Sequence, residues 1–173
     1  MKYIALFVIA IISFSCTSSI NQETVNYENE TILVGEVNWN GLTKLPYSTW
    51  FDPNYLDYNV DTATLNTAHL QLSEVDIIVF LGTWCSDSQL EVPQFYKILD
   101  YLHYDVGSMH VIALEKLENK QMVSPEHEEE DYGITHVPTF IFKRNDKEIG
   151  RITEYPNVTL EKDMVVILMK ERI

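Results

Sequence analysis

The sequence predicts an α/β domain with a mixed central sheet and helices on both faces. Residues 75–81 form a nearly continuous apolar run, which is typical of a strand buried on both faces. Apolar residues at helical spacing follow over residues 86–103, and a turn at 144–147 separates two strand-like segments. Strands that alternate with helices and end in a hairpin indicate a mixed sheet between helices.

The elements before residue 75 are the least regular. Residues 31–37 predict a short strand. The segment 39–58 is rich in aromatic and turn-forming residues, which suggests either a ligand-binding aromatic box or irregular structure packed on the core. We favour the second interpretation, because aromatic side chains are usually buried. Asp61 can cap a helix that runs to about Leu72.

The middle of the chain predicts a helix, a strand and a polar connection. The helix over 86–103 contains Pro93, which should kink it or leave a backbone carbonyl unpaired. Residues 108–114 predict the next strand. The acidic segment 115–131 predicts a loop or a short solvated helix.

The last part of the chain predicts a β-hairpin and a final helix. The pattern alternates after Pro138, turns at 144–147 and continues over 148–153. Asn157 or Thr159 can cap the helix that follows.

The first residues differ from the rest and resemble a signal peptide. Lys2 precedes an apolar stretch, and small residues lead to Cys16. This resembles a bacterial lipoprotein cleavage site with Cys16 as the lipidated residue, although Ser13 stands where leucine is usual. Ordinary secretion and an uncleaved anchor are the alternatives, and all three place the domain outside the cytoplasmic membrane.

Four segments are therefore predicted along the chain. Residues 1–15 are a signal peptide, and residues 16–30 hold the lipid-anchor site and a flexible spacer. Residues 31–60 are an aromatic-rich extension, and residues 61–173 are the main domain.

The charge excludes one class of partner. A formal net charge of −14 repels phosphate, so we expect no nucleic acid as a partner. It also opposes binding to an anionic bilayer, so the expected membrane contact is the lipid alone. Lipidation of Cys16 would leave Cys85 as the one thiol of the mature protein, because the chain has two cysteines. A single exported thiol is expected to be reactive or to pair with another molecule.

The candidate site is the run Phe80-Leu81-Gly82-Thr83-Trp84-Cys85-Ser86-Asp87-Ser88. It places Cys85 between a buried strand and the start of a helix, where backbone N–H groups and the helix dipole stabilise a thiolate. Asp87 and Glu91 oppose this effect with negative charge. A second thiol would be expected three residues after Cys85, where the chain has Ser88.

These motifs resemble the thioredoxin superfamily over roughly residues 61–172. The resemblance rests on Trp84-Cys85 after a buried strand, on Pro93, on Gly133-Ile134 ahead of Val137-Pro138-Thr139, and on the closing hairpin. It implies a thioredoxin-like fold and a cis-proline at Pro138 beside the reactive Cys85. It further implies that Val137 pairs with a bound peptide through its backbone, with Thr139 and His136 in the same groove.

Two positions depart from the pattern of that family. Its dithiol members use a second cysteine to resolve the mixed disulfide, and Ser88 cannot do so, although its hydroxyl can donate a hydrogen bond to the thiolate. Thioredoxins also keep an acid six residues before the cysteine, where this chain has Val79. An external reductant or substrate thiol must therefore complete any cycle.

We expect thiol–disulfide exchange by a single-cysteine C-x-x-S site: Cys85 is the nucleophile, Ser88 assists it, and Trp84 flanks it. The expected partners are thiol- or disulfide-bearing proteins or small thiols. One alternative is a non-catalytic module that binds a peptide in the cis-proline groove. Another is a cluster-binding site like that of monothiol glutaredoxins, which export and acidity disfavour. A catalytic Cys85–His136 pair is a further, weaker reading.

The remaining signals predict neither a cofactor nor a metal site. The chain has no glycine-rich phosphate loop. The other histidines show no metal-ligand spacing: His69, His103, His110 and His127. The sequence leaves the oligomeric state open.

Overall fold

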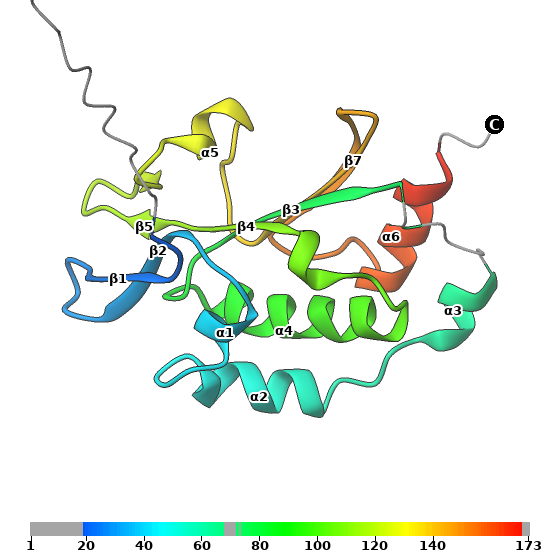
Figure 1. Cartoon of the computed structure of the whole chain (residues 1–173), viewed down its shortest axis with the longest axis horizontal. Helices are drawn as coiled ribbons and strands as arrows, with labels where there is room; N and C mark the ends of the chain where they lie inside the picture. Colours follow the sequence, from blue (N-terminus) through cyan, green and yellow to red (C-terminus); the bar gives the residue numbers. More distant parts are fainter. Residues whose placement is uncertain (1–18, 68–71, 73, 171–173) are drawn as a thin grey trace, which may run out of the picture.

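A computed structural model describes residues 19–67, 72 and 74–170 of the chain. Its centre is a six-stranded mixed sheet in the order β1-β2-β4-β3-β7-β8 (Figure 1). The neighbours β3 and β4 are parallel, and the other neighbouring pairs are antiparallel. This confirms the predicted mixed sheet. The predicted signal peptide and Cys16 lie outside the described residues.

After residue 75 the longer helices and the strands of the main sheet follow the predictions closely, but the segment 115–131, predicted to be a loop or a short solvated helix, also contains two short strands. The main sheet contains β1 (Gln22–Val25), β2 (Thr31–Glu36), β3 (Asp76–Leu81), β4 (His110–Ala113), β7 (Thr139–Arg144) and β8 (Lys147–Thr153). A small second sheet pairs β5 (Glu115–Lys116) with β6 (Met122–Val123). The helices are α1 (Trp39–Leu42), α2 (Ser48–Leu56), α3 (Thr62–Thr67), α4 (Ser86–Tyr101), α5 (Glu128–Asp131) and α6 (Leu160–Met169), with a 3₁₀ turn, η1, at Val106–Ser108.

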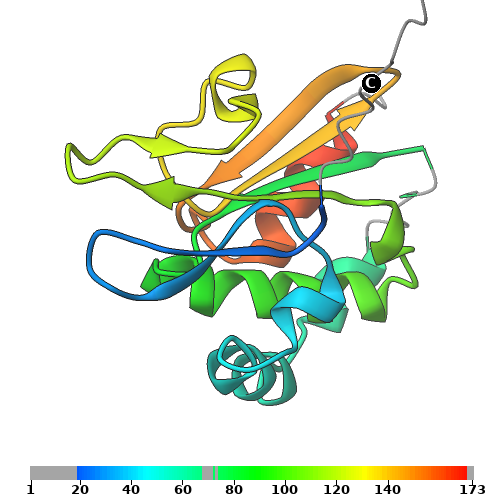
Figure 2. The same ribbon diagram turned by 60° about the vertical axis from the view of Figure 1, so that its left-hand side comes forward.

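Helices lie on both faces of the sheet, but unequally. The larger apolar cluster joins one face of the sheet to α2, α4 and α6, with the Phe95 and Phe140 ring centroids 4.4 Å apart. The smaller cluster lies on the other face, where Phe80 contacts Tyr132 next to the short α5. Figure 2 shows α2 and α4 on one side of the sheet, with α5 and the β5–β6 hairpin on the other.

Side-chain caps fix several element boundaries. Asp61 accepts from the Thr64 N–H at 3.0 Å, so the predicted cap of α3 is confirmed. Thr159 accepts from the Lys162 N–H at 3.2 Å and caps α6. Asn145 and Asp146 both have positive φ, which the tight turn between β7 and β8 requires.

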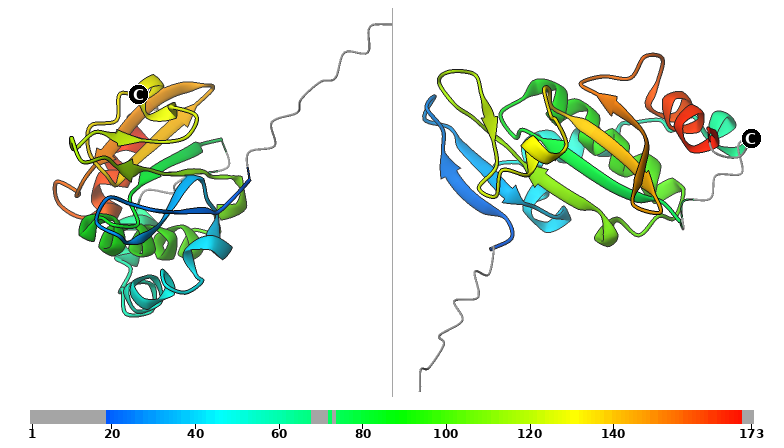
Figure 3. Two further views of the ribbon diagram at one scale, coloured as in Figure 1. Left: turned by 90° about the vertical axis from the view of Figure 1, so that its left-hand side faces the viewer. Right: turned by 90° about the horizontal axis from the view of Figure 1, so that it is seen from above.

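The structure differs from the prediction before residue 60. Part of the predicted spacer is a strand, because β1 pairs antiparallel with β2. The segment predicted to be irregular contains α1 and α2, and α2 packs on α4. Figure 3 shows β1 and β2 at one end of the molecule and α6 at the other. The extension is thus part of the same sheet and core as the rest of the domain.

The helix α4 continues through Pro93. Proline lacks an N–H, so the Gln89 carbonyl one turn earlier loses its partner in the helix. The side-chain Nδ2 of Asn54 on α2 donates to that carbonyl at 3.0 Å. The extension therefore supplies the hydrogen bond that the proline removes.

Glu161 makes a second connection to the extension. This buried carboxylate accepts from the Tyr58 hydroxyl at 2.8 Å and from the Asp61 N–H at 3.0 Å.

Among the described residues, no helix has both the length and the apolar character needed to cross a membrane.

Candidate functional site

Cys85 lies at the N-terminus of α4, directly after the loop that follows β3. It is the N-cap residue, and its side chain is partly exposed. Because Phe80 of β3 is paired with Thr139 of β7, the end of β3 and the start of β7 lie side by side. The Cys85 thiol donates to the Val137 carbonyl, with 3.4 Å between Sγ and O. The Val137–Pro138 peptide bond is cis, so the structure brings Cys85, Val137 and Pro138 together.

Ser88 occupies the position of the missing second thiol and is fully buried. Its Oγ accepts a hydrogen bond from the Gly82 N–H at 3.1 Å. The hydroxyl thus holds the loop before Cys85 against the first turn of α4.

Trp84 is fixed by contacts on three sides. Its Nε1–H donates to the Leu114 carbonyl at 2.7 Å, and the Lys116 ammonium lies 5.1 Å from its ring centroid. Its indole also covers Gly82, where a Cβ would lie 2.6 Å from Cε2. Trp84 is therefore a fixed wall beside Cys85.

The other predicted groove residues differ in their exposure. Thr139 is buried and donates from Oγ1 to the His136 carbonyl at 2.8 Å. The His136 side chain is exposed and contacts the Thr135 hydroxyl, 3.0 Å from Nδ1. Within the described ranges, the Val137 N–H has no hydrogen-bond partner.

Acidic side chains flank the start of α4. Burial raises the pKa of Glu91 to about 7, with further contributions from Asp87 and Glu161. Asp87 lies in the first turn of the helix, and Glu91 follows one turn later. This side of the site therefore gains negative charge as Glu91 ionises near neutral pH.

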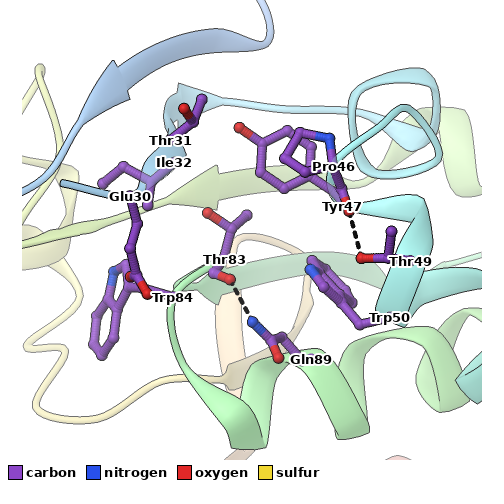
Figure 4. A pocket seen from close by; sticks show the side chains of 10 residues that line it. All are labelled: Glu30, Thr31, Ile32, Pro46, Tyr47, Thr49, Trp50, Thr83, Trp84 and Gln89. Atoms are coloured by element: carbon purple, nitrogen blue, oxygen red, sulfur yellow. Dashed lines mark hydrogen bonds between the residues drawn. The ribbon is translucent and has the colours of Figure 1, made fainter. Parts of the chain in front are cut away.

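A cavity of about 190 Å³ adjoins the loop before Cys85 (Figure 4). Thr83 and Trp84 of this loop and Gln89 of α4 form one wall of the cavity. Residues of Glu30–Ile32 and of Pro46–Trp50 form the opposite wall. The Thr83 hydroxyl accepts from the Leu33 N–H of β2 at 3.1 Å, and the Thr83 carbonyl accepts from Gln89 Nε2 at 2.8 Å. Strand β2 thus holds the loop directly.

This cavity is not predicted by the sequence patterns. The one segment that could have indicated it is the aromatic segment 39–58, for which packing on the core is the favoured interpretation. Tyr47 and Trp50 do pack against the core, and both also line the cavity. The residues opposite them, Thr83 and Gln89, carried no signal of their own.

Among the described residues, Cys85 does not belong to a group of three or more side chains placed to bind one metal ion. The group that the structure does bring together is His127, Glu129 and Glu130, at the start of α5.

The sequence matches no protein-family model and no curated protein. Among solved structures, a protein of unknown function from Pseudomonas aeruginosa aligns with a TM-score of 0.54 at 11% identity, covering 78% of this chain and 90% of that one. The Schistosoma mansoni thioredoxin pre-protein aligns at 0.33 and 23% identity, covering 55% and 78%. Chlamydomonas reinhardtii thioredoxin f2 aligns at 0.36 and 16% identity, covering 65% and 93%. The fold is thioredoxin-like.

Proposed function

We propose that the protein carries out thiol–disulfide exchange through Cys85 as the single thiol of its site. The observation that carries this proposal is the placement of the thiol. Cys85 is the partly exposed N-cap of α4, and its Sγ lies 3.4 Å from the carbonyl that precedes cis-Pro138. The partial exposure of Cys85 allows a substrate to approach it.

The chemistry begins when the Cys85 thiolate attacks one sulfur of a substrate disulfide. A new disulfide forms between Cys85 and that sulfur, the old S–S bond breaks, and the second substrate sulfur leaves as a thiolate. A thiolate of the substrate or of a small thiol then attacks the mixed disulfide and releases Cys85. Attack by a substrate thiol gives isomerisation with no net oxidation. Net reduction consumes two external thiols, which become a disulfide.

The backbone beside Pro138 supports a docking role for this segment. An extended peptide can pair with the backbone at Val137, whose carbonyl lies 3.4 Å from the Cys85 sulfur, and this pairing would align a substrate disulfide with the thiolate. Trp84 bounds the site on the side of the cavity. His136 is exposed close by in the chain and is available to contact the substrate.

The proposal is tested with a scrambled multi-disulfide protein incubated in a glutathione buffer. The wild-type protein should accelerate recovery of the native disulfides, and Cys85→Ser should abolish this acceleration. Ser86→Ala, a change at the exposed neighbouring residue, should retain it. Equal rates for wild type and Cys85→Ser would overturn the enzyme proposal. Specific retention of a peptide by both proteins would then indicate the binding module instead.

We also propose that the protein is exported and anchored through a lipid on Cys16. The support is the sequence pattern of residues 1–16. Mass spectrometry of the protein expressed in a bacterium should find a lipid-modified N-terminal Cys16, and Cys16→Ala should move the protein out of the membrane fraction. An unmodified Cys16 in mature protein would contradict this.

A further inference from the structure

A second group of chemically capable side chains lies at α5, apart from the Cys85 site. His127 Nδ1 lies 3.5 Å from Glu129 Oε1 and 3.7 Å from Glu130 Oε1. One donor atom from each of the three residues falls within 4.8 Å of the others. The group thus combines one imidazole nitrogen with two carboxylate oxygens.

Glu129 is the feature that separates this group from an ordinary acidic surface. Its side chain is only 5% exposed. Its Oε2 accepts from the Ser124 N–H at 3.0 Å and from the Ser124 hydroxyl at 2.6 Å. Its Oε1 is buried and accepts no hydrogen bond among the described residues. A buried carboxylate oxygen that accepts no hydrogen bond is costly unless a nearby positive charge compensates it.

The hydrogen bonds from Ser124 to Oε2 determine the direction in which Oε1 of Glu129 points. Ser124 fixes Oε2, and Oε1 is thereby turned toward His127. A hydrogen-bonded partner that orients a ligating carboxylate is a regular feature of metal sites.

We propose that His127, Glu129 and Glu130 form a binding site for a divalent first-row transition metal such as Zn²⁺. Ligands about 2.1 Å from a tetrahedral zinc ion lie about 3.4 Å from one another. The two distances from His127 Nδ1, 3.5 and 3.7 Å, are close to that spacing. The imidazole favours a transition metal over Mg²⁺ or Ca²⁺, which prefer sites made of oxygen alone. This site is independent of the exchange chemistry proposed for Cys85.

Open space adjoins two of the three proposed ligand residues. Glu129 and Glu130 also line a cavity of about 400 Å³, whose other lining residues include Lys120, Ile134 and Thr135. Three protein ligands leave at least one position open to water or to a ligand from a partner.

The test is a calorimetric titration of the full chain with Zn²⁺, after both cysteines have been alkylated with iodoacetamide so that neither can bind the ion. One Zn²⁺ per chain should bind, and a tenfold excess of Mg²⁺ should not displace it. His127→Asn and Glu129→Gln should each weaken the binding at least about tenfold. Zn²⁺ should also raise the unfolding temperature of the wild type and not that of these variants.

Matched controls come from the same chain. His103 is also an exposed histidine, and its φ of 54° is close to the 57° of His127, so His103→Asn is the equivalent change away from the site. Glu126→Gln neutralises an exposed acid of the same segment. Both controls should bind Zn²⁺ as the wild type does. Retained binding in the two site variants, or wild-type binding only at millimolar zinc, would overturn the proposal. Melting curves without metal verify that each variant is folded.

Discussion

The Oγ of Ser88 accepts a hydrogen bond from the Gly82 N–H at 3.1 Å, across the loop that presents Cys85. Ser88 is completely buried. The residue that stands in the place of a second thiol therefore also holds the loop to the helix.

Ser88→Cys should convert the site to a dithiol. The new thiol lies in the same helical turn as Cys85 and can attack a mixed disulfide there. We expect an internal disulfide under oxidising conditions and a gain of disulfide reductase activity with a dithiol as reductant. Loss of the Gly82 hydrogen bond should destabilise the reduced form by about 1 kcal/mol.

Thiol counting by mass spectrometry and urea unfolding measure the two effects. Ser86→Cys adds a thiol at the exposed neighbouring position and should give neither the disulfide nor the activity. A Ser88→Cys protein whose two thiols stay free under oxidation would contradict the proposed geometry of the turn.

Gly82→Ala should disturb Trp84. An added Cβ would lie 2.6 Å from Cε2 and 2.9 Å from Nε1 of the indole, so the ring must move and its hydrogen bond to the Leu114 carbonyl is strained or lost. Overpacking of this kind costs about 1–3 kcal/mol. Urea unfolding measures the loss, and Gly107→Ala, where the nearest neighbour is the flexible Asp105 carboxylate, should cost less. Equal losses in the two variants would contradict the close packing of Trp84 on Gly82.

Asn54 and Pro93 should be coupled energetically. Asn54→Ala leaves the Gln89 carbonyl without a partner and should cost about 1–3 kcal/mol. Pro93→Ala restores a backbone N–H that can bond to the same carbonyl. In the Pro93→Ala background, Asn54→Ala should therefore cost clearly less. A double-mutant cycle by chemical denaturation measures the coupling, and additive effects would show that Asn54 acts elsewhere.

Glu91 should make the protein less stable as the pH rises. Its folded-state pKa is about 7, against 4.5 for the free side chain. Between these values the folded protein keeps a proton that the unfolded chain has lost, so stability falls as the pH rises through this window. One pKa unit corresponds to about 1.4 kcal/mol, and partial exposure of the side chain reduces the effect.

Glu91→Gln should remove this component. The variant should gain about 1–2 kcal/mol over the wild type at pH 8 and little at pH 4.5, by chemical denaturation at both values. Glu126→Gln, at an exposed acid, should gain nothing at either pH. An equal difference between Glu91→Gln and wild type at the two pH values would contradict the raised pKa.

Much of this arrangement was predictable from local patterns. The apolar run before Gly82 defined the central strand, and Trp84-Cys85 with Val137-Pro138 marked the two sides of the site. Strand β1 could not be predicted in this way, because its residues are mostly exposed and it exists only through pairing with β2. Helix α2 was missed because its apolar residues do not gather on one face. Phe51 and the bond from Asn54 to Gln89 hold it against α4, and both depend on tertiary contacts.

The hydrogen bond from the Leu33 N–H to Thr83 joins strand β2 to the loop before Cys85, so two distant segments of the chain meet beside that loop. Cys85 and the loop before it lie on one stretch of chain, whereas seven of the ten residues that line the adjoining cavity lie between residues 30 and 50. Changes at Glu30, Tyr47 or Trp50 can therefore reshape this cavity while the segment that carries Cys85 stays the same. The cavity and the thiol are encoded in separate segments, so each can vary without the other.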